Sequence, residues 1–138
     1  MSVAERISPF VGRLLIAWLF LGEVRFRLED WEGTVGLMHM RHIPDANLLL
    51  AIALIVMLLG GLALLLGYHT RQGALLLFGF TILATVFMHD YWRIGNSIER
   101  DADYEIFIRN IAVAGGLLLL VGMGPGSFAM DNRPKGKR

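Results

Sequence analysis

Polar side chains that could bind a ligand lie close to the ends of long apolar stretches. Glu23 ends the first stretch, and His89 with Asp90 ends the third. Arg109 and Asn110 lie in the first turns of the fourth. Imidazole and guanidinium groups can donate hydrogen bonds to a carbonyl oxygen, so His89 or Arg109 could hold the head group of a quinone or another small polar ligand. If the stretches form a bundle, all five side chains lie at a similar depth near one end.

The same region also has a purely structural interpretation. Tyr91 or Trp92 could form the aromatic wall of a ligand site, but an interfacial aromatic belt requires the same side chains. Arg109 could pair with Glu23 or Asp90 and merely tie helices together. Two interpretations therefore stay open, a polar ligand site and a set of internal ties.

The sequence lacks the residues that several other kinds of chemistry would need. It has no cysteine, which excludes thiol chemistry, thiolate-bound iron–sulfur clusters and zinc sites built from cysteine. We find no nucleophile with a base, no phosphate-binding loop and no pair of carboxylates at catalytic spacing. A formal net charge of +1 is too small to indicate a nucleic-acid partner.

Two histidines in the first predicted outer loop have the spacing of a metal or haem site. His39 and His42 are three residues apart and would share one helix face, as two imidazole ligands require if His89 approached them. A hydrated pair of histidines at the membrane interface gives the same spacing, and we predict no metal site.

The composition indicates where these residues must be placed. Of 138 residues 55% are hydrophobic and 18% are charged, and the mean hydropathy is +0.56. A bilayer core about 30 Å thick needs roughly 20 apolar helical residues, and four stretches approach that length. They cover residues 7–25, 46–66, 73–89 and 106–122. We therefore predict an all-α fold, an integral membrane four-helix antiparallel bundle that contacts the lipid bilayer.

Arg13 interrupts the first of these stretches. Six helical residues place it about 9 Å from the near edge of the bilayer, within reach of a snorkelling side chain. We expect it to anchor the helix there. Because Arg13 also interrupts the apolar region that a cleaved signal peptide over residues 1–22 would need, we expect this segment to stay in the mature protein.

Charge counting predicts the orientation. Four spans put both termini and the 68–72 turn on one side, with six basic residues: Arg6, Arg71, Arg133, Lys135, Lys137 and Arg138. The two opposite loops hold five basic residues: Arg25, Arg27, Arg41, Arg93 and Arg100. Because the cluster 133–138 is dense and follows the last span, we place both termini in the cytoplasm.

We predict a single membrane domain over residues 1–138. Residues 31–43 have apolar side chains at helical spacing before Pro44, which predicts a short interfacial helix. We expect residues 90–105 to form a solvated loop and residues 131–138 a basic cytoplasmic tail. Gly60-Gly61 and Gly115-Gly116 remove side-chain bulk inside the spans, so we expect helices to approach closely there.

Several strings, taken together, resemble the DoxX family over about residues 13–131. These are residues 66–71, 89–92 and 107–116, Gly124-Pro125-Gly126 leading to Asp131, and Gly33-Thr34 with Ile43-Pro44. The resemblance implies a small four-helix protein of the bacterial inner membrane. It also implies a relation to the membrane subunit of thiosulfate:quinone oxidoreductase and to membrane components of oxidative-stress and thiol-handling assemblies.

The resemblance bears on particular residues. Arg13, Arg27, Arg109 and Asn110 fall where the family commonly has basic or polar groups, which adds Arg27 to the candidate ligand-binding residues. Met57 departs from the pattern, because family members often have Glu at this mid-membrane position. An acid there would be the natural proton or quinone partner. Its absence weighs against a quinone-reducing or proton-coupled role.

Two function classes follow. The first is a membrane subunit that binds quinone non-covalently or docks a partner oxidoreductase, with the candidate residues Glu23, Arg27, His89, Asp90, Trp92, Arg109 and Asn110. The second is a non-catalytic membrane scaffold or assembly factor. A solute carrier is weaker, because four spans make a narrow bundle that would need a homo-oligomer, and spans two and three show no polar stripe.

Overall fold

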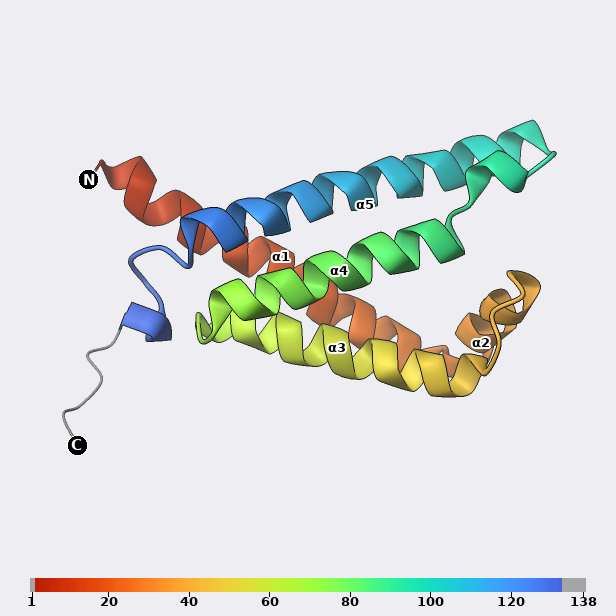
Figure 1. The fold of residues 1–138 in the computed structure, drawn as a ribbon, viewed down its shortest axis with the longest axis horizontal. Helices are drawn as coiled ribbons and strands as arrows, with labels where there is room; N and C mark the ends of the chain where they lie inside the picture. Colours follow the sequence, from red (N-terminus) through yellow and green to blue (C-terminus); the bar gives the residue numbers. More distant parts are fainter. Residues whose placement is uncertain (1, 133–138) are drawn as a thin grey trace.

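The computed structural model describes residues 2–132, and this part of the chain is helical with short connections (Figure 1). The four long helices are α1 (Val3–Glu29), α3 (Ala46–Leu66), α4 (Thr70–Met88) and α5 (Ser97–Met123). The shorter elements are α2 (Trp31–Met40) and the single-turn 3-10 helices η1 (Tyr91–Arg93) and η2 (Met130–Asn132). Each long helix is long and apolar enough to cross a membrane. The prediction of an all-α membrane bundle is confirmed.

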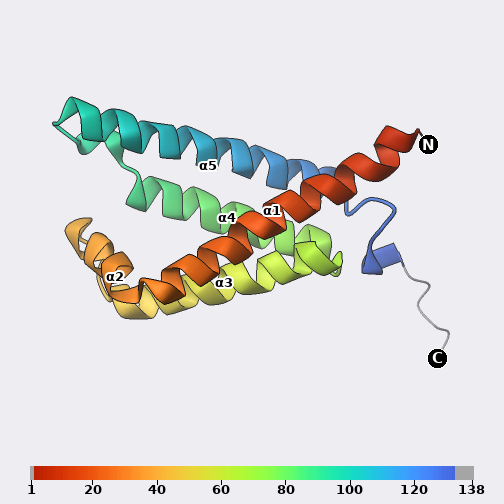
Figure 2. The same cartoon turned by 180° about the vertical axis from the view of Figure 1, so that it is seen from behind.

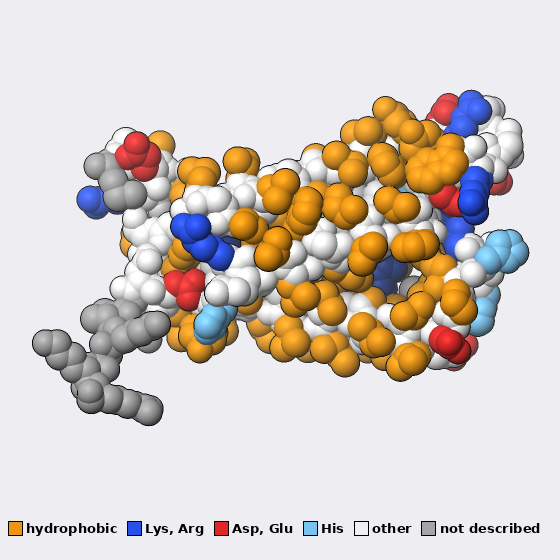
Figure 3. Space-filling model, in the orientation of Figure 1, with side chains coloured by type: hydrophobic (Ala, Val, Ile, Leu, Met, Phe, Trp, Pro, Cys, Tyr) orange, Lys and Arg blue, Asp and Glu red, His pale blue; other side chains and the backbone are white. Residues whose placement is uncertain are grey.

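The surface of the bundle is what a lipid environment requires. On the face shown in Figure 3, hydrophobic side chains cover the middle of the molecule and charged ones gather at its two ends. Trp18 is 75% exposed, Leu119 64% and Phe87 62%. A water-soluble monomer rarely exposes contiguous apolar patches larger than a few hundred Å². These side chains are therefore in contact with the lipid bilayer.

The long helices pack in two pairs. α1 packs along α3, α4 packs along α5, and α3 joins the pairs by also packing on α4. The pairs lie together at the end that holds the α3–α4 turn and both termini, and they diverge toward the end that holds α2 (Figures 1 and 2). We call these the turn end and the α2 end. α1 also meets α5, where Ile16 lies beside Gly116, before the two helices diverge.

Two glycines allow the close packing of α3 on its neighbours. A Cβ atom added at Gly60 would lie 2.4 Å from Cγ of Leu77 in α4, and one at Gly61 would lie 2.9 Å from Cδ2 of Leu21 in α1. No hydrophobic force drives helices together in lipid, so close backbone approach strengthens packing instead. The expected close approach at Gly60-Gly61 is confirmed, whereas a Cβ at Gly115 would meet open space.

The structure shifts two sequence-based boundaries in the outer loops. α5 begins at Ser97 because the side chain of Asn96 caps it, accepting from the backbone N–H of Ile98 at 3.0 Å. The prediction of a loop was therefore wrong for residues 97–105. α2 ends at Met40 rather than near 43, and His42 beyond it has a φ of 57°. Of the predicted basic tail, residues 133–138 lie outside the described residues.

Arg13 is buried rather than snorkelling. Its side chain is 1% exposed, and its Nη1 and Nη2 atoms donate to the carbonyl oxygens of Pro125 and Phe128 at 3.0 and 2.6 Å. These carbonyls belong to the segment after α5, residues 124–132, which folds back over the turn end. The expectation of a snorkelling anchor was wrong, because the chain itself supplies the acceptors that headgroups would have supplied.

Asp131 fixes the same segment to the α3–α4 turn. Its carboxylate accepts from the backbone N–H groups of His69 and Thr70 at 2.7 and 2.9 Å, at the start of α4 where no side chain of the turn itself provides a cap. Its own N–H donates to the carbonyl of Gly67 at 2.8 Å. Burial of the carboxyl acts to raise its pKa, but its interactions with Thr70 and His69, the two backbone hydrogen bonds foremost, together outweigh burial and hold the pKa of Asp131 below its usual value.

Candidate functional site

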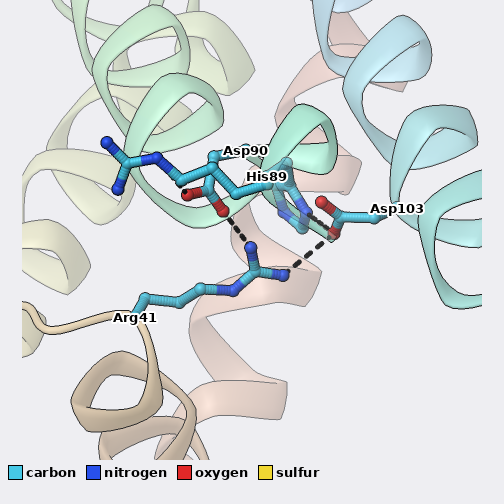
Figure 4. Close-up of polar contacts among 5 residues, drawn as sticks. Arg41, His89, Asp90 and Asp103 are labelled. Carbon is cyan, nitrogen blue, oxygen red and sulfur yellow. Dashed lines mark hydrogen bonds and ion pairs between the residues drawn. The ribbon is translucent and has the colours of Figure 1, made fainter. Parts of the chain in front are cut away.

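Four polar side chains from three parts of the chain meet at the α2 end. Arg41 bonds to Asp90, and its Nη2 lies 3.4 Å from Oδ1 of Asp103 (Figure 4). Nδ1 of His89 lies 2.8 Å from the same Oδ1 atom. We call Arg41, His89, Asp90 and Asp103 the polar cluster. It joins the α1–α3 pair to the α4–α5 pair at the end where the helix pairs diverge.

Three of the four cluster residues lie at or next to the ends of helices. Arg41 follows α2 and is its C-cap, while His89 is the C-cap of α4 and Asp90 precedes η1. Only Asp103 lies inside a helix, two turns into α5. Helix ends expose backbone groups and can turn side chains in directions that a helix interior cannot. A small set of residues thereby brings two acids, one guanidinium and one imidazole together.

The cluster is largely withdrawn from solvent. The exposed fractions of the side chains are 26% for Arg41, 23% for His89, 17% for Asp90 and 10% for Asp103. Burying charges is tolerated when they are paired and hydrogen-bonded. Oδ2 of Asp103 is the exception, because it is buried and has no hydrogen-bond partner among the described residues. The cluster therefore keeps hydrogen-bonding capacity that its own members do not use.

Four aromatic rings near the cluster in sequence pack against one another. Tyr91 makes edge-to-face contacts with Trp92, Tyr104 and Phe107 at centroid distances of 5.3, 5.0 and 5.3 Å, and Trp92 lies 6.1 Å from Phe107. Tyr91 follows Asp90 directly, and Tyr104 follows Asp103. Trp92 thus belongs to a group of rings that holds η1 on α5.

The structure brings together only part of the predicted set. His89 and Asp90 belong to the polar cluster. Glu23 instead bonds to Arg27, one turn along α1, at 2.6 Å. Within residues 2–132, the expected pairing of Arg109 with Glu23 or Asp90 does not form.

Arg109 and Asn110 occupy different faces of α5. Arg109 is exposed, and Asn110 is half-buried on the face that also carries Asp103, seven residues earlier. No hydrogen bond or ion pair involves either side chain within residues 2–132. Asn110 therefore lies on the same helix face as the cluster about two turns deeper, whereas Arg109 points away from it.

The histidine pair loses the geometry that motivated a metal site. His39 is in the last turn of α2, but His42 lies beyond the helix, so the two do not share a helix face. Both are exposed, and His89 is bonded to Asp103. Within residues 2–132, no group of three His, Cys, Asp or Glu side chains is arranged to hold a metal ion.

Arg41 and Asp103 were missed by sequence reasoning. Asp103 was assigned to a solvated loop, yet it lies seven residues before Asn110 and shares its helix face with Ala114 and Leu117. Extending the helical period N-terminally from the apolar stretch would have placed Asp103 on the buried face. Arg41 had no such signal, because its position depends on how the chain turns after α2.

The comparisons with known proteins place the chain in a family. Residues 8–90 match the DoxX family model. The chain is also 31% identical over 132 residues to the inner membrane protein YqjF of Escherichia coli strain K12, and the match covers 95% of both chains. The chain belongs to the DoxX family.

Further relatives agree with this assignment. The inner membrane protein YphA of Escherichia coli strain K12 is 27% identical over 133 residues, covering 96% of this chain and 94% of YphA. The Surfeit locus protein 4 homolog of Drosophila melanogaster is 30% identical over 132 residues, which are 95% of this chain but 42% of that protein. No solved structure matches the chain. Four candidate spans and relatives named inner membrane proteins support a multi-pass protein of the inner membrane.

Within this DoxX-family chain, the mid-membrane position where a Glu was expected is apolar. Met57 is 3% exposed and lies in the hydrophobic core of α3. Among the described residues, the one buried acidic residue is Asp103, at the α2 end. Any polar chemistry of the bundle interior therefore has to be sought near the polar cluster rather than at position 57.

Proposed function

We propose that this DoxX-family protein is the membrane subunit of an oxidoreductase assembly and binds the head group of a quinone at His89 and Asp103. The observation that carries the proposal is the 2.8 Å contact between Nδ1 of His89 and Oδ1 of Asp103 inside a lipid-embedded bundle. A carboxylate bound to one imidazole nitrogen fixes the tautomer and leaves Nε2 for a ligand. Neutral Nε2 accepts from a quinol hydroxyl, and protonated Nε2 donates to a quinone carbonyl.

The surroundings of His89 suit an amphipathic ligand. Trp92 and its neighbours offer aromatic faces or edges to a flat ring. On the face shown in Figure 3, the surface is hollowed toward the α2 end, and basic side-chain atoms are visible inside the hollow. An open apolar groove on α1 ends at Glu23 and is lined by Leu15, Trp18, Leu19 and Gly22.

The proposal covers binding and leaves electron transfer to a partner subunit. Because Met57 replaces the expected acid, this chain has no carboxylate at mid-depth in α3 to take up protons during quinone reduction. We further propose that both termini face the cytoplasm. The termini and the 68–72 turn carry six basic residues against five in the opposite loops, with four of the six dense in sequence after the last span, and the positive-inside rule supports placing that side in the cytoplasm. The polar cluster then faces the periplasm.

A scaffold or assembly factor is the second candidate, and one observation favours it. Arg41 connects the two helix pairs through Asp90 and Asp103, so the cluster can be explained as a tie between them. A tie alone, however, has no use for the buried, unpartnered Oδ2 of Asp103.

Quinone retention tests the proposal. The full chain is purified from membranes in a mild detergent, its lipids are extracted, and quinone per protein is measured. We expect close to one quinone per chain, and at least a tenfold loss in His89→Leu. His42→Leu is the matched control, because His42 is an exposed histidine at the same end. Wild-type protein that retains no more quinone than His89→Leu would contradict the proposal, and a stoichiometric protein partner without quinone would favour the scaffold.

A further inference from the structure

A line of polar groups continues from the polar cluster into the bundle. Thr81, Thr85 and His89 follow one another at intervals of four on α4, so they share one side of that helix. Asp103 and Asn110 lie two turns apart on the buried face of α5, the helix that packs along α4. We call these five residues the polar seam. Within the third span, the seam consists of two threonines, which a hydropathy average does not single out.

Three atoms of the seam are buried without a hydrogen-bond partner among the described residues. They are Oγ1 of Thr81, Oγ1 of Thr85 and Oδ2 of Asp103, in residues that are 6%, 1% and 8% exposed. A buried threonine in a helix normally bonds back to the carbonyl four residues earlier. Thr34 in α2 does so, donating to the carbonyl of Asp30 at 2.9 Å. Thr81 and Thr85 do not.

The spacing of the side chains along the seam is one that a bound water molecule can bridge. Side chains four residues apart on a helix face are about 5–6 Å apart between their Cβ atoms. A water molecule with two hydrogen bonds of about 2.8 Å spans such a gap. Unpaired polar atoms in protein interiors are as a rule satisfied by ordered water, which needs two to four polar partners. Along the seam, Thr81, Thr85, Asp103 and Asn110 are the side chains that could serve as partners of such waters.

We propose that the polar seam binds a short file of water molecules along the buried faces of α4 and α5, reached from the α2 end at Asp103. The file ends at Thr81. The next residue on that side of α4, toward the turn end, is Leu77, which is fully buried, packs against Gly60 and offers no polar atom to a water molecule. The seam is therefore a half-channel that opens at the α2 end and does not cross the membrane. This proposal needs no quinone and stands independently of the proposed function.

Cysteine accessibility maps the seam directly, because the natural chain has no cysteine. Thr85→Cys, Thr81→Cys and Leu77→Cys are each prepared in the full chain and reconstituted into liposomes. A small, charged methanethiosulfonate reagent is present on both sides of the membrane. The cysteine thiolate, which forms only where water reaches the sulfur, attacks the reagent, forms a mixed disulfide and releases methanesulfinate. We expect Thr85→Cys and Thr81→Cys to be modified at least tenfold faster than Leu77→Cys.

The stability of a valine variant gives a second, independent reading. If water satisfies the hydroxyl of Thr85, Thr85→Val loses hydrogen bonds and lowers the Tm. If the hydroxyl is dry and unpaired, the same change removes an unsatisfied polar group and raises the Tm. Thr34→Val calibrates the comparison, because its hydroxyl is bonded within the chain. Equal modification of all three cysteine variants together with a raised Tm for Thr85→Val would overturn the proposal.

The two proposals fail separately. If Thr85→Cys and Thr81→Cys are not labelled faster than Leu77→Cys but the protein retains quinone, the water file is contradicted and the quinone site is supported. Labelling of Thr85→Cys in a protein that retains no quinone supports the water file and removes the quinone site.

Discussion

The two ends of the bundle are held together by different means. At the turn end, Arg13 and Asp131 bond to backbone groups, and Nη1 of Arg71 donates to the carbonyl of Val121 at 3.0 Å. At the α2 end, side chains bond to other side chains, and Asp103 keeps an oxygen unused. Backbone acceptors are fixed by the fold and have no titration of their own. The ties at the turn end therefore run from side chains to the backbone, whereas those at the α2 end run between side chains, which is where we propose that a ligand binds.

Removing Arg13 should have the largest effect. Arg13→Gln loses two charge-assisted hydrogen bonds and leaves two carbonyls without their donor, which we expect to destabilise the protein by about 3 kcal/mol. Thermal unfolding in detergent measures the change. Arg6→Gln, an exposed arginine on the same helix, should change the Tm little. If the two variants had equal stability, Arg13 would not hold the C-terminal segment.

Removing Arg41 should have the next largest effect. Arg41→Gln leaves Asp90 and Asp103 close together without their shared cation, which we expect to cost about 2 kcal/mol, less than for a fully buried pair. Adding Asp103→Asn should recover part of that loss, because the two residues are coupled. Arg25→Gln is the control, since the pair of Arg25 with Glu29 is exposed and contributes little. Strictly additive losses in the double variant would contradict the coupling.

Asp131 predicts a weakening of the turn end in acid. Its folded-state pKa lies below the unfolded value of about 3.9, so its stabilising effect is present above that value and disappears as the pH falls through the folded pKa. Asp131→Asn should cost about 1 kcal/mol at neutral pH, the usual value of a helix cap. The difference between wild type and variant should shrink below about pH 4. A constant difference from pH 7 to pH 3 would show that the carboxylate charge is not what matters.

The smallest effect is expected for Glu23 and Arg109. Because these two side chains do not pair within the described residues, Glu23→Gln and Arg109→Gln should change stability additively, each by less than about 1 kcal/mol. A double variant that is more stable than the sum of its parts predicts would reveal a contact between them.

The sequence predicted the fold better than the site. Hydropathy gives four helices because lipid leaves no other way to satisfy the backbone, and Gly60-Gly61 indicates a close packing surface. The prediction of the site residues was wrong where contacts between distant parts of the chain determine the position of a side chain. Arg13 looked like an anchor because nothing in its local sequence reveals that residues 125–128 fold back onto it. Arg41 finds its partners only because α2 ends at Met40 and the chain turns toward α4. Asp103 could have been found, had the helical period been followed beyond the apolar residues.

The central claim is that His89 and Asp103 form a binding site. Titration with a short-chain quinone tests it most directly, in a background of Trp18→Phe and Trp31→Phe that leaves Trp92 as the fluorescent probe. We predict saturable quenching that is lost in His89→Leu and weakened at least tenfold in Asp103→Asn, with both variants still monodisperse. Quenching that does not saturate, or that is equally strong in His89→Leu, would contradict the account.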